Sequence, residues 1–206
     1  QNCIVFALPE FSDFCLLQSR VHEIWARFVG SSFEDRPIYT PTDCFEKYPF
    51  PPDVEDLRCL NDSGAEYYAA RQVLMRRRNE GLTSIYNRFH SPEENASEIQ
   101  SLRELHAAMD RAVLDAYGWT DIPTDCEFIL DYEDEDEESS RRKKPWRYRW
   151  PDEVRDEVLA RLLKLNGERA REEELAGLRV GGKLRRPVNA DDTEDDAVLD
   201  DETDDQ

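Results

Sequence analysis

Two groups of basic residues are the side chains in this sequence best suited to binding chemistry. Arg76, Arg77 and Arg78 are consecutive, and four bases at 141–144 lead into the stretch PWRYRW at 145–150. Guanidinium groups that alternate with aromatic rings suit phosphate contact and stacking on bases. They also suit cation–π packing onto the rest of the protein, which is the interpretation we favour for 145–150. The three consecutive arginines equally suit a helix end, where cations offset the negative end of the dipole.

Carboxylates and histidine are weaker candidates, in their case for catalysis. Glu93 and Glu94 are adjacent, but helix capping explains them, and a solvated charge run explains the acids that follow Asp131. His106 lies within an apolar helical stripe, which favours a packed side chain over a catalytic one. The sequence contains no glycine-rich phosphate loop, no GxSxG or HExxH motif and no cysteine–histidine cluster. We therefore predict no catalytic residue, no cofactor-binding residue and no metal ligand in this chain.

The charge is unevenly distributed along the chain. The net charge is −20, yet ten acids and no base occupy residues 191–205, and acids fill most of 131–138. Such tracts remain solvated, so the rest of the chain is close to neutral. Five scattered cysteines predict free thiols in a reducing, cytoplasmic location. Because no apolar run approaches about 20 residues, we expect no membrane partner.

Apolar spacing predicts the elements that position these residues. Asp13 is expected as the N-cap of the first helix, and two overlapping capping boxes, Ser91 with Glu94 and Asn95 with Glu98, precede the strongest helical pattern. Helices are expected at 13–29, 62–79, 82–89, about 95–117 and 151–174, and strands at 4–8 and 126–132. The predicted fold class is α+β, mainly α-helical, with short N-terminal strands and a helical C-terminal region that ends in a disordered acidic tail.

The order of four segments resembles the C-terminal target-recognition and helical region of large adenine-specific DNA methyltransferases of the type IIG restriction–modification class. The segments are LLQSRVHEIWARFVGSS (16–32), YTPTDCFEKYPFPP (39–52), GLTSIYNRFHSPEENASEIQSLRELHAAMDRAVLDAYGW (81–119) and KKPWRYRWPDEVRDEVLARLLKLN (143–166). The resemblance runs in pieces from about residue 4 to residue 175. The second segment taken alone is less specific, because specificity subunits of type I systems carry comparable endings.

The resemblance implies a whole enzyme that transfers a methyl group from S-adenosylmethionine to the exocyclic amine of adenine in double-stranded DNA, often with a fused nuclease. The glycine motif for the methyl donor and the Asn/Asp-Pro-Pro-Tyr/Phe motif are absent here, because Phe50 precedes Pro51–Pro52 and Asp53 follows it. We expect both motifs, and the bound S-adenosylmethionine, in an upstream methyltransferase domain of the same polypeptide. The chain is then a C-terminal fragment that cannot perform the methyl transfer alone.

In this interpretation the chain supports a lobe that reads DNA, and its own side chains contact phosphates. The segment 39–52 holds four prolines, which fix the chain path with little entropy to lose, so we expect its four aromatic rings to be packing anchors. Its polar residues are expected to be more exposed. The candidates for DNA contact are Thr40, Thr42, Lys47, Arg76, Arg77, Arg78, Lys143, Lys144 and Arg147.

The predicted organisation follows the same resemblance, and it leaves one alternative open. The expected parts are the end of a target-recognition region (1–52), a helical support region (53–132), a charged linker (133–150), a C-terminal helix (151–180) and a disordered acidic tail (181–206). The alternative is a non-enzymatic helical protein-interaction module whose acidic tail binds basic partners. In that case the segment 39–52 would be a protein-docking surface.

Overall fold

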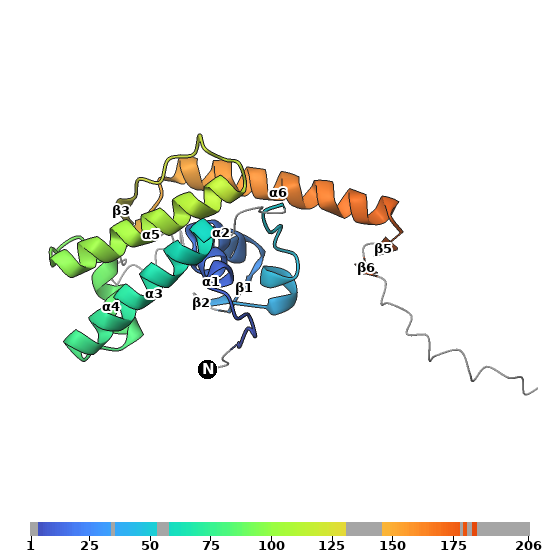
Figure 1. Ribbon diagram of the computed structural model, residues 1–206. Coiled ribbons are helices and arrows are strands. Elements are labelled where there is room, and N and C mark those ends of the chain that lie inside the picture. The colour runs from blue at the N-terminus through green and yellow to red at the C-terminus, as the bar shows by residue number, and fades with distance from the viewer. Residues whose placement is uncertain are drawn as a thin grey trace, which may run out of the picture. The chain divides into compact units, whose positions relative to one another are not determined.

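In the residues that the structure describes, the protein is mainly helical, with three small antiparallel strand pairs. The computed structural model describes residues 4–33, 36–52, 58–130, 146–177, 179–180 and 183–184 (Figure 1). The helices are α1 (Phe11–Gln18), α2 (Arg20–Val29), α3 (Arg58–Arg78), α4 (Leu82–Phe89), α5 (Ser97–Ala116), α6 (Asp152–Leu175) and a single π-helical turn at Pro41–Phe45. The strand pairs are β1 (Ser31–Phe33) with β2 (Arg36–Ile38), β3 (Glu127–Leu130) with β4 (Trp146–Arg149), and β5 (Arg179–Val180) with β6 (Lys183–Leu184). The predicted α-rich class is thereby confirmed.

The chain divides into two compact units, residues 1–166 and residues 167–206. The second unit contains the last turns of α6 and the β5–β6 hairpin. The predicted acidic tail, 181–206, lies outside the described residues except for β6. All core and cleft features described below belong to the first unit.

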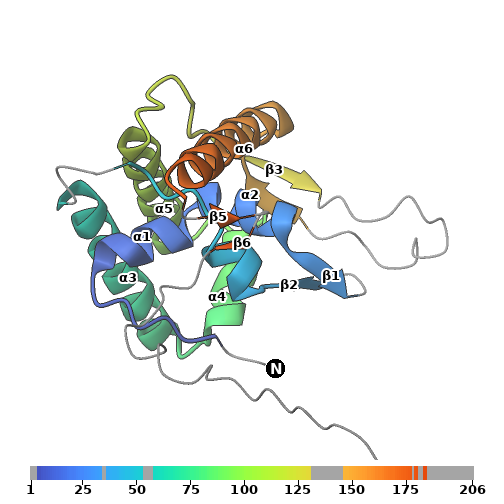
Figure 2. The same cartoon turned by 90° about the vertical axis from the view of Figure 1, so that its right-hand side faces the viewer.

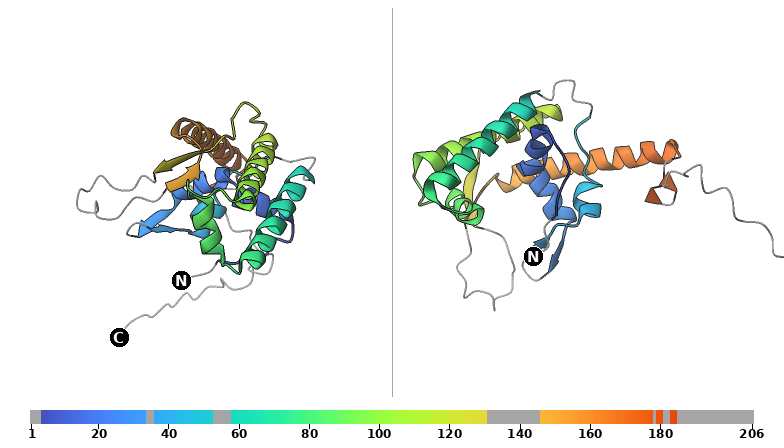
Figure 3. Two further views of the ribbon diagram at one scale, coloured as in Figure 1. Left: turned by 90° about the vertical axis from the view of Figure 1, so that its left-hand side faces the viewer. Right: turned by 60° about the horizontal axis from the view of Figure 1, so that its bottom comes forward.

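The core of the first unit is formed where α1 packs against α3 and α3 packs against α5 (Figures 1 and 3). Tyr67 of α3, Met109 and Val113 of α5, and Cys15 of α1 are fully buried there. Gly64 permits the close contact between α1 and α3, because a Cβ at this position would collide with the carbonyl oxygen of Phe11. The helix interior tolerates a glycine here because packing requires the space.

The expected single helix from Asp13 to Val29 is wrong, because the chain breaks into α1 and α2 at Ser19. Ser19 has an extended backbone, with φ −67° and ψ 157°, and its hydroxyl donates to the carbonyl of Leu16 at 2.8 Å. The same oxygen accepts from the His22 amide at 3.3 Å and caps α2. Asp13 is not an N-cap, since α1 already begins at Phe11. Apolar spacing alone concealed the break because buried residues continue on both sides of it.

The N-terminal segment is not the expected strand: in the part of the chain that the structure describes, residues 4–9 pair with no other strand. Phe6 instead packs against the rings of Tyr39 and Phe45, with centroids 6.0 and 4.9 Å apart. Of this run, Phe6 is held by ring contacts, whereas Ile4, Val5 and Leu8 are exposed.

The aromatic rings of segment 39–52 are packing anchors, as predicted. Tyr48 is buried, and its ring meets His22 at 4.6 Å and Phe50 at 4.9 Å. The carbonyl of Pro49 accepts from the Tyr117 hydroxyl at 2.9 Å, which ties the segment to the end of α5. Figure 2 shows the β1–β2 hairpin extending away from α2. The segment thus closes over α2 and α5 through side chains rather than through regular backbone pairing.

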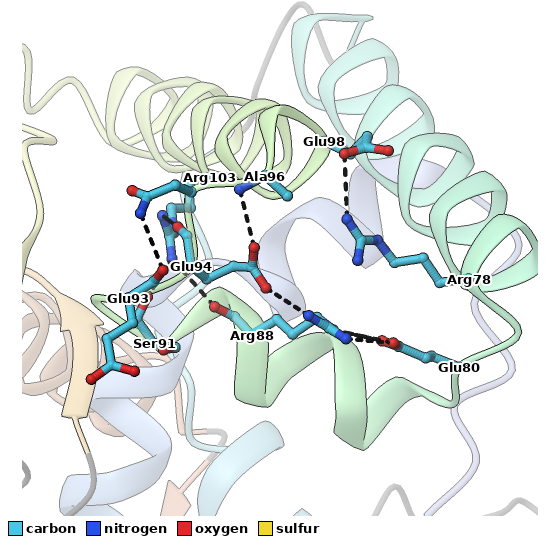
Figure 4. A network of polar contacts seen from close by, with 10 residues as sticks. Arg78, Glu80, Arg88, Ser91, Glu93, Glu94, Ala96, Glu98 and Arg103 are labelled. Atoms are coloured by element: carbon cyan, nitrogen blue, oxygen red, sulfur yellow. Dashed lines mark hydrogen bonds and ion pairs between the residues drawn. The ribbon is translucent and has the colours of Figure 1, made fainter.

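Neither expected capping box starts α5, which begins at Ser97 after Ala96. The carboxylate of Glu94 accepts the Ala96 amide at 3.0 Å and so satisfies one of the amides left without a partner at the start of the helix (Figure 4). Arg88 holds the same carboxylate at 2.7 Å and also binds Glu80 at 2.8 Å. The start of α5 is therefore held by an ion-pair network around Arg88, and not by the side chains of Ser91 and Asn95.

The predicted linker 133–150 contains a structured end. Residues 133–145 lie outside the described residues, but Trp146–Arg149 form β4, with Leu130 opposite Trp146 and Glu127 opposite Arg149. Strand β3 lies within the predicted strand 126–132, and Pro151 precedes α6 as expected. Strand β4 was not foreseen because its charged residues mask the alternating pattern.

Candidate functional site

A cleft of about 750 Å³ is bordered by α2, the end of α4, β4 and the first half of α6. Its volume lies within the range of small-ligand sites, roughly 300–1,000 Å³. Among the described residues that line it, only Glu23 and Asp156 are acidic. The arginines that line it are Arg20, Arg27, Arg147, Arg149 and Arg155. Asp152, next to the cleft, pairs with Arg149 at 2.6 Å and with Arg155 at 2.8 Å. In a chain with a net charge of −20, five arginines around one cleft make it a candidate site for an anion.

Helix and strand periodicity bring these arginines together. Arg20 and Arg27 are seven residues apart on α2 and therefore lie on one face of the helix. Arg147 and Arg149 are two residues apart on β4 and point to the same side of the strand. Arg155 extends the group from the first turns of α6. The cleft thus assembles side chains from elements that are more than 100 residues apart in sequence.

Arg20 is buried at the inner end of the cleft, where it is bound by Asp110 of α5. Its Nη1 lies 2.5 Å from Asp110 Oδ2, and its backbone amide donates to Oδ1 at 2.9 Å. The two side chains are 5 and 0% exposed. Burial acts to raise the pKa of Asp110, but the charge of Arg20 and the bonds around the carboxylate outweigh burial and hold the pKa below its usual value. Arg20 therefore fixes the structure of the cleft rather than offering a charge to a ligand.

His106 belongs to this buried cluster, in agreement with the packed role predicted for it. Its Nδ1 lies 2.9 Å from Arg20 Nη1. Because a guanidinium only donates, Nδ1 is the acceptor in this contact. The ring meets Tyr67 edge-on at 5.3 Å. Although it borders the inner part of the cleft, the ring is only 5% exposed and belongs to the packed cluster around Arg20.

Arg103 holds the end of α4, which borders the cleft. Its guanidinium donates to the carbonyl oxygens of Ser91 at 2.9 Å and Phe89 at 3.0 Å, and to those of Arg88 and Glu94 at 3.3 Å (Figure 4). These carbonyls lie at the end of α4 and in the turn after it, and the unpaired carbonyls that end a helix need such donors. Arg103 thereby holds the end of α4, including His90, in one position.

Tyr148 of β4 lies between the two buried arginines. The guanidinium carbons of Arg20 and Arg103 are 5.7 and 5.2 Å from its ring centroid. Trp150, the last residue of PWRYRW, is 1% exposed and belongs to the core. The packing interpretation of this stretch is confirmed for Tyr148 and Trp150, while Arg147 and Arg149 border the cleft.

Two histidines that line the cleft are neutral near pH 7. The Nδ1 of His90 accepts the Tyr148 amide at 3.1 Å, and burial, together with the charge of Arg147, lowers the pKa of His90 to about 4. Burial lowers the pKa of His22 to about 4 as well, and its Nε2 lies 3.0 Å from the Tyr39 hydroxyl. The positive charge of the cleft therefore comes from its arginines.

Of the nine residues predicted to contact DNA, the structure places Arg147 in the cleft. Lys47 lies on the segment 39–52 and pairs with Asp43 at 2.6 Å, and Thr40 and Thr42 are near it in the chain. Arg76 and Arg77 are exposed at the end of α3, and Arg78 lies 3.4 Å from Glu98. Lys143 and Lys144 lie outside the described residues.

Sequence reasoning missed Arg20, Arg27, Arg149 and Arg155 as members of one site. The spacing of Arg20 and Arg27 on a helix was available as a signal, but nothing in the sequence indicated that β4 and α6 face the same space. Within the described ranges, no group of three or more histidine, cysteine, aspartate or glutamate side chains is arranged to hold a metal ion. The cysteines described by the structure, Cys15, Cys44, Cys59 and Cys126, are free thiols.

Comparison with known proteins gave no match to a family model, to a curated protein or to a solved structure. None of the helices in the described part of the chain combines the length and the apolar character needed to cross a membrane.

Proposed function

We propose that this chain is the C-terminal part of an S-adenosylmethionine-dependent, adenine-specific DNA methyltransferase of the restriction–modification type. In the cytoplasm it contacts double-stranded DNA through phosphates and supports target recognition. The upstream methyltransferase domain of the same polypeptide binds S-adenosylmethionine and performs the methyl transfer. The observation that carries the proposal is the arginine-lined cleft in a chain whose overall charge opposes DNA.

Phosphate binding suits the cleft because its outer arginines reach solvent. Arg27 is 44% and Arg155 is 39% exposed. Their carboxylate partners also reach solvent: Glu23 is 54% exposed, Asp156 is 65% exposed, and Asp152, which binds Arg155 at 2.8 Å, is 32% exposed. Exposed ion pairs contribute only about 0–1 kcal/mol, so a phosphate can replace the carboxylate at small cost. Electrostatic contact with phosphates supplies most of the sequence-independent affinity for DNA.

The segments that resemble methyltransferase sequences also meet around this cleft, which supports the same proposal. The segment 16–32 contains α2 with Arg20 and Arg27, and the segment 143–166 contains β4 and the first half of α6. Segment 39–52 packs its rings against α2 through His22. Residues shared with a family would be expected to gather where the family has a common task.

Fluorescence anisotropy with a labelled DNA duplex, measured over a series of salt concentrations, tests the DNA-binding part. Arg147→Glu and Arg27→Glu are expected to weaken binding and to reduce the slope of log K against log salt by about 1 for each phosphate that is no longer neutralised. Lys164→Glu is the matched control, because Lys164 is exposed on α6 and does not line the cleft. Equal affinities and slopes for all three variants and the wild type would remove the cleft from the DNA site.

The coding sequence upstream of Gln1 tests the methyltransferase part separately. An Asn-Pro-Pro-Tyr-like motif in the same reading frame is expected. A start codon directly before Gln1, with no methyltransferase gene beside it, would overturn the proposal and favour the protein-interaction module.

A further inference from the structure

The outer part of the cleft also contains exposed apolar side chains, which phosphate contact alone leaves unexplained. Phe28 is 54% exposed and Ile38 is 44% exposed, and both line the cleft beside Arg27. In the part of the chain that the structure describes, Phe28 makes no contact with another aromatic ring. Tyr148, in contrast, has a ring partner in Phe89 at 5.8 Å. An open aromatic face next to guanidinium groups is the combination that proteins use to bind single-stranded nucleic acids.

We propose that the cleft receives one unstacked nucleotide of a DNA strand, with its base on Phe28 and its phosphate on Arg27 and Arg147. This inference rests on the proposed DNA-binding function and names the part of the DNA that enters the site. A stacked base pair shields its base faces inside the duplex, so the phosphates of intact duplex can meet the outer arginines while no base face is free to stack on Phe28. An unstacked nucleotide presents a base face and a phosphate together.

The size and the floor of the cleft suit this occupant. A volume of about 750 Å³ exceeds what an inorganic phosphate would fill and lies within the range for ligands of nucleotide size. The helices around the inner end of the cleft are held in place, because Arg20 of α2 is bound by Asp110 and Arg103 is bound to the carbonyls that end α4. A rigid site loses little conformational freedom when it binds.

His90 adds a neutral hydrogen-bonding group to the site. Since its Nδ1 accepts the Tyr148 amide, the neutral ring carries its proton on Nε2. Among the described residues Nε2 has no hydrogen-bond partner, and it is not among the buried atoms that lack one. An N–H donor of this kind suits a base acceptor, whereas the arginines suit the phosphate.

The base contact is tested with two labelled single strands, an oligothymidylate and the same strand with its central nucleotides abasic. The wild-type protein is expected to prefer the strand with bases by about tenfold, which corresponds to one base stacked on an aromatic ring. Phe28→Ala is expected to abolish this preference. Leu163→Ala, which truncates an apolar side chain that is 40% exposed on α6 and outside the cleft, is expected to keep it. Thermal unfolding of each variant checks that the fold is retained.

The outcomes separate this inference from the proposed function. Duplex binding that depends on Arg147, together with equal affinity of the wild type for the two single strands, would overturn the nucleotide site and leave the proposed function intact. A strand preference that depends on Phe28, without any duplex binding, would instead overturn the proposed function. An unchanged preference in Phe28→Ala would also overturn the inference, because Phe28 would then not be the stacking surface.

Discussion

Arg20 and Arg103 are enclosed by helices and rings, whereas Arg27 and Arg155 reach solvent at the cleft. The enclosed pair find their partners outside their own helices, as Arg20 does with Asp110, 90 residues on. The solvent-exposed pair have partners within four residues on their own helix. An arginine's role in this protein therefore follows from its burial: a buried guanidinium that is bound to partners on other elements organises the fold, and an exposed one that is paired with a carboxylate on its own helix is available to an anion.

The largest expected effect concerns the buried arginines. Asp110→Ala leaves the buried guanidinium of Arg20 without its charge partner, which costs about 3–5 kcal/mol of unfolding free energy. Asp121→Ala is the matched control: its carboxylate is 64% exposed, so its removal from Arg161 should cost much less stability than Asp110→Ala. Urea unfolding measures both. Similar losses of stability for the two variants would break the distinction between buried and exposed arginines.

A second prediction concerns the uncharged histidines beside the arginines. His22 has a pKa of about 4 in the folded protein and about 6.5 when unfolded, so below pH 6.5 the unfolded chain binds a proton that the folded one refuses. Stability is therefore unaffected by this ring above about pH 6.5. It falls as the pH drops towards 4, and the loss reaches about 2–3 kcal/mol at pH 4.5. His22→Gln should lose less stability than the wild type between pH 7 and pH 4.5 in urea titrations. Identical losses of stability would mean that burial does not keep this ring neutral.

A third prediction concerns the close packing of α1 against α3. Gly64→Ala places a methyl group against the Phe11 carbonyl and should destabilise the protein by about 1–3 kcal/mol. Gly167→Ala in α6 meets nothing within 4 Å and should be stabilising by up to about 1 kcal/mol. Thermal denaturation of both variants gives the comparison. A stable Gly64→Ala variant would show that α1 can move away from α3.

The smallest expected effect on stability belongs to the cleft arginines. Arg147→Glu should change the unfolding free energy by no more than about 0.5 kcal/mol, because the side chain is only partly buried. Its large effect should appear in DNA binding. Urea unfolding that shows a destabilisation comparable to that of Asp110→Ala would place Arg147 with the structural arginines.

The sequence predicted the elements whose apolar spacing is regular. Helices α3, α5 and α6 and strand β3 lie close to their expected positions. The break at Ser19 escaped prediction, because it is enforced by a capping hydroxyl and by a carboxylate on a distant helix rather than by a change in spacing. Capping of α5 by Glu94 escaped for the same reason, since Arg88 must hold that carboxylate in place.

The candidate site was predictable only in its chemistry. Alternating arginine and aromatic residues at 145–150 correctly drew attention to β4, and Arg147 lies in the cleft. Its neighbours Arg27 and Arg155 come from helices that meet β4 only in three dimensions. Lys47, in contrast, pairs with Asp43, which lies four residues before it. The sequence alone does not show whether a lysine binds such a neighbour or a phosphate.

The backbone amide of Arg20 is the first amide of α2. The first amides of a helix have no acceptor within their own helix and ordinarily exchange their hydrogen with solvent rapidly. At the start of α2 this proton is held instead by Asp110, from a helix 90 residues away. Its deuterium uptake would therefore time the separation of α2 from α5, and a single backbone position would report how often the floor of the cleft comes apart.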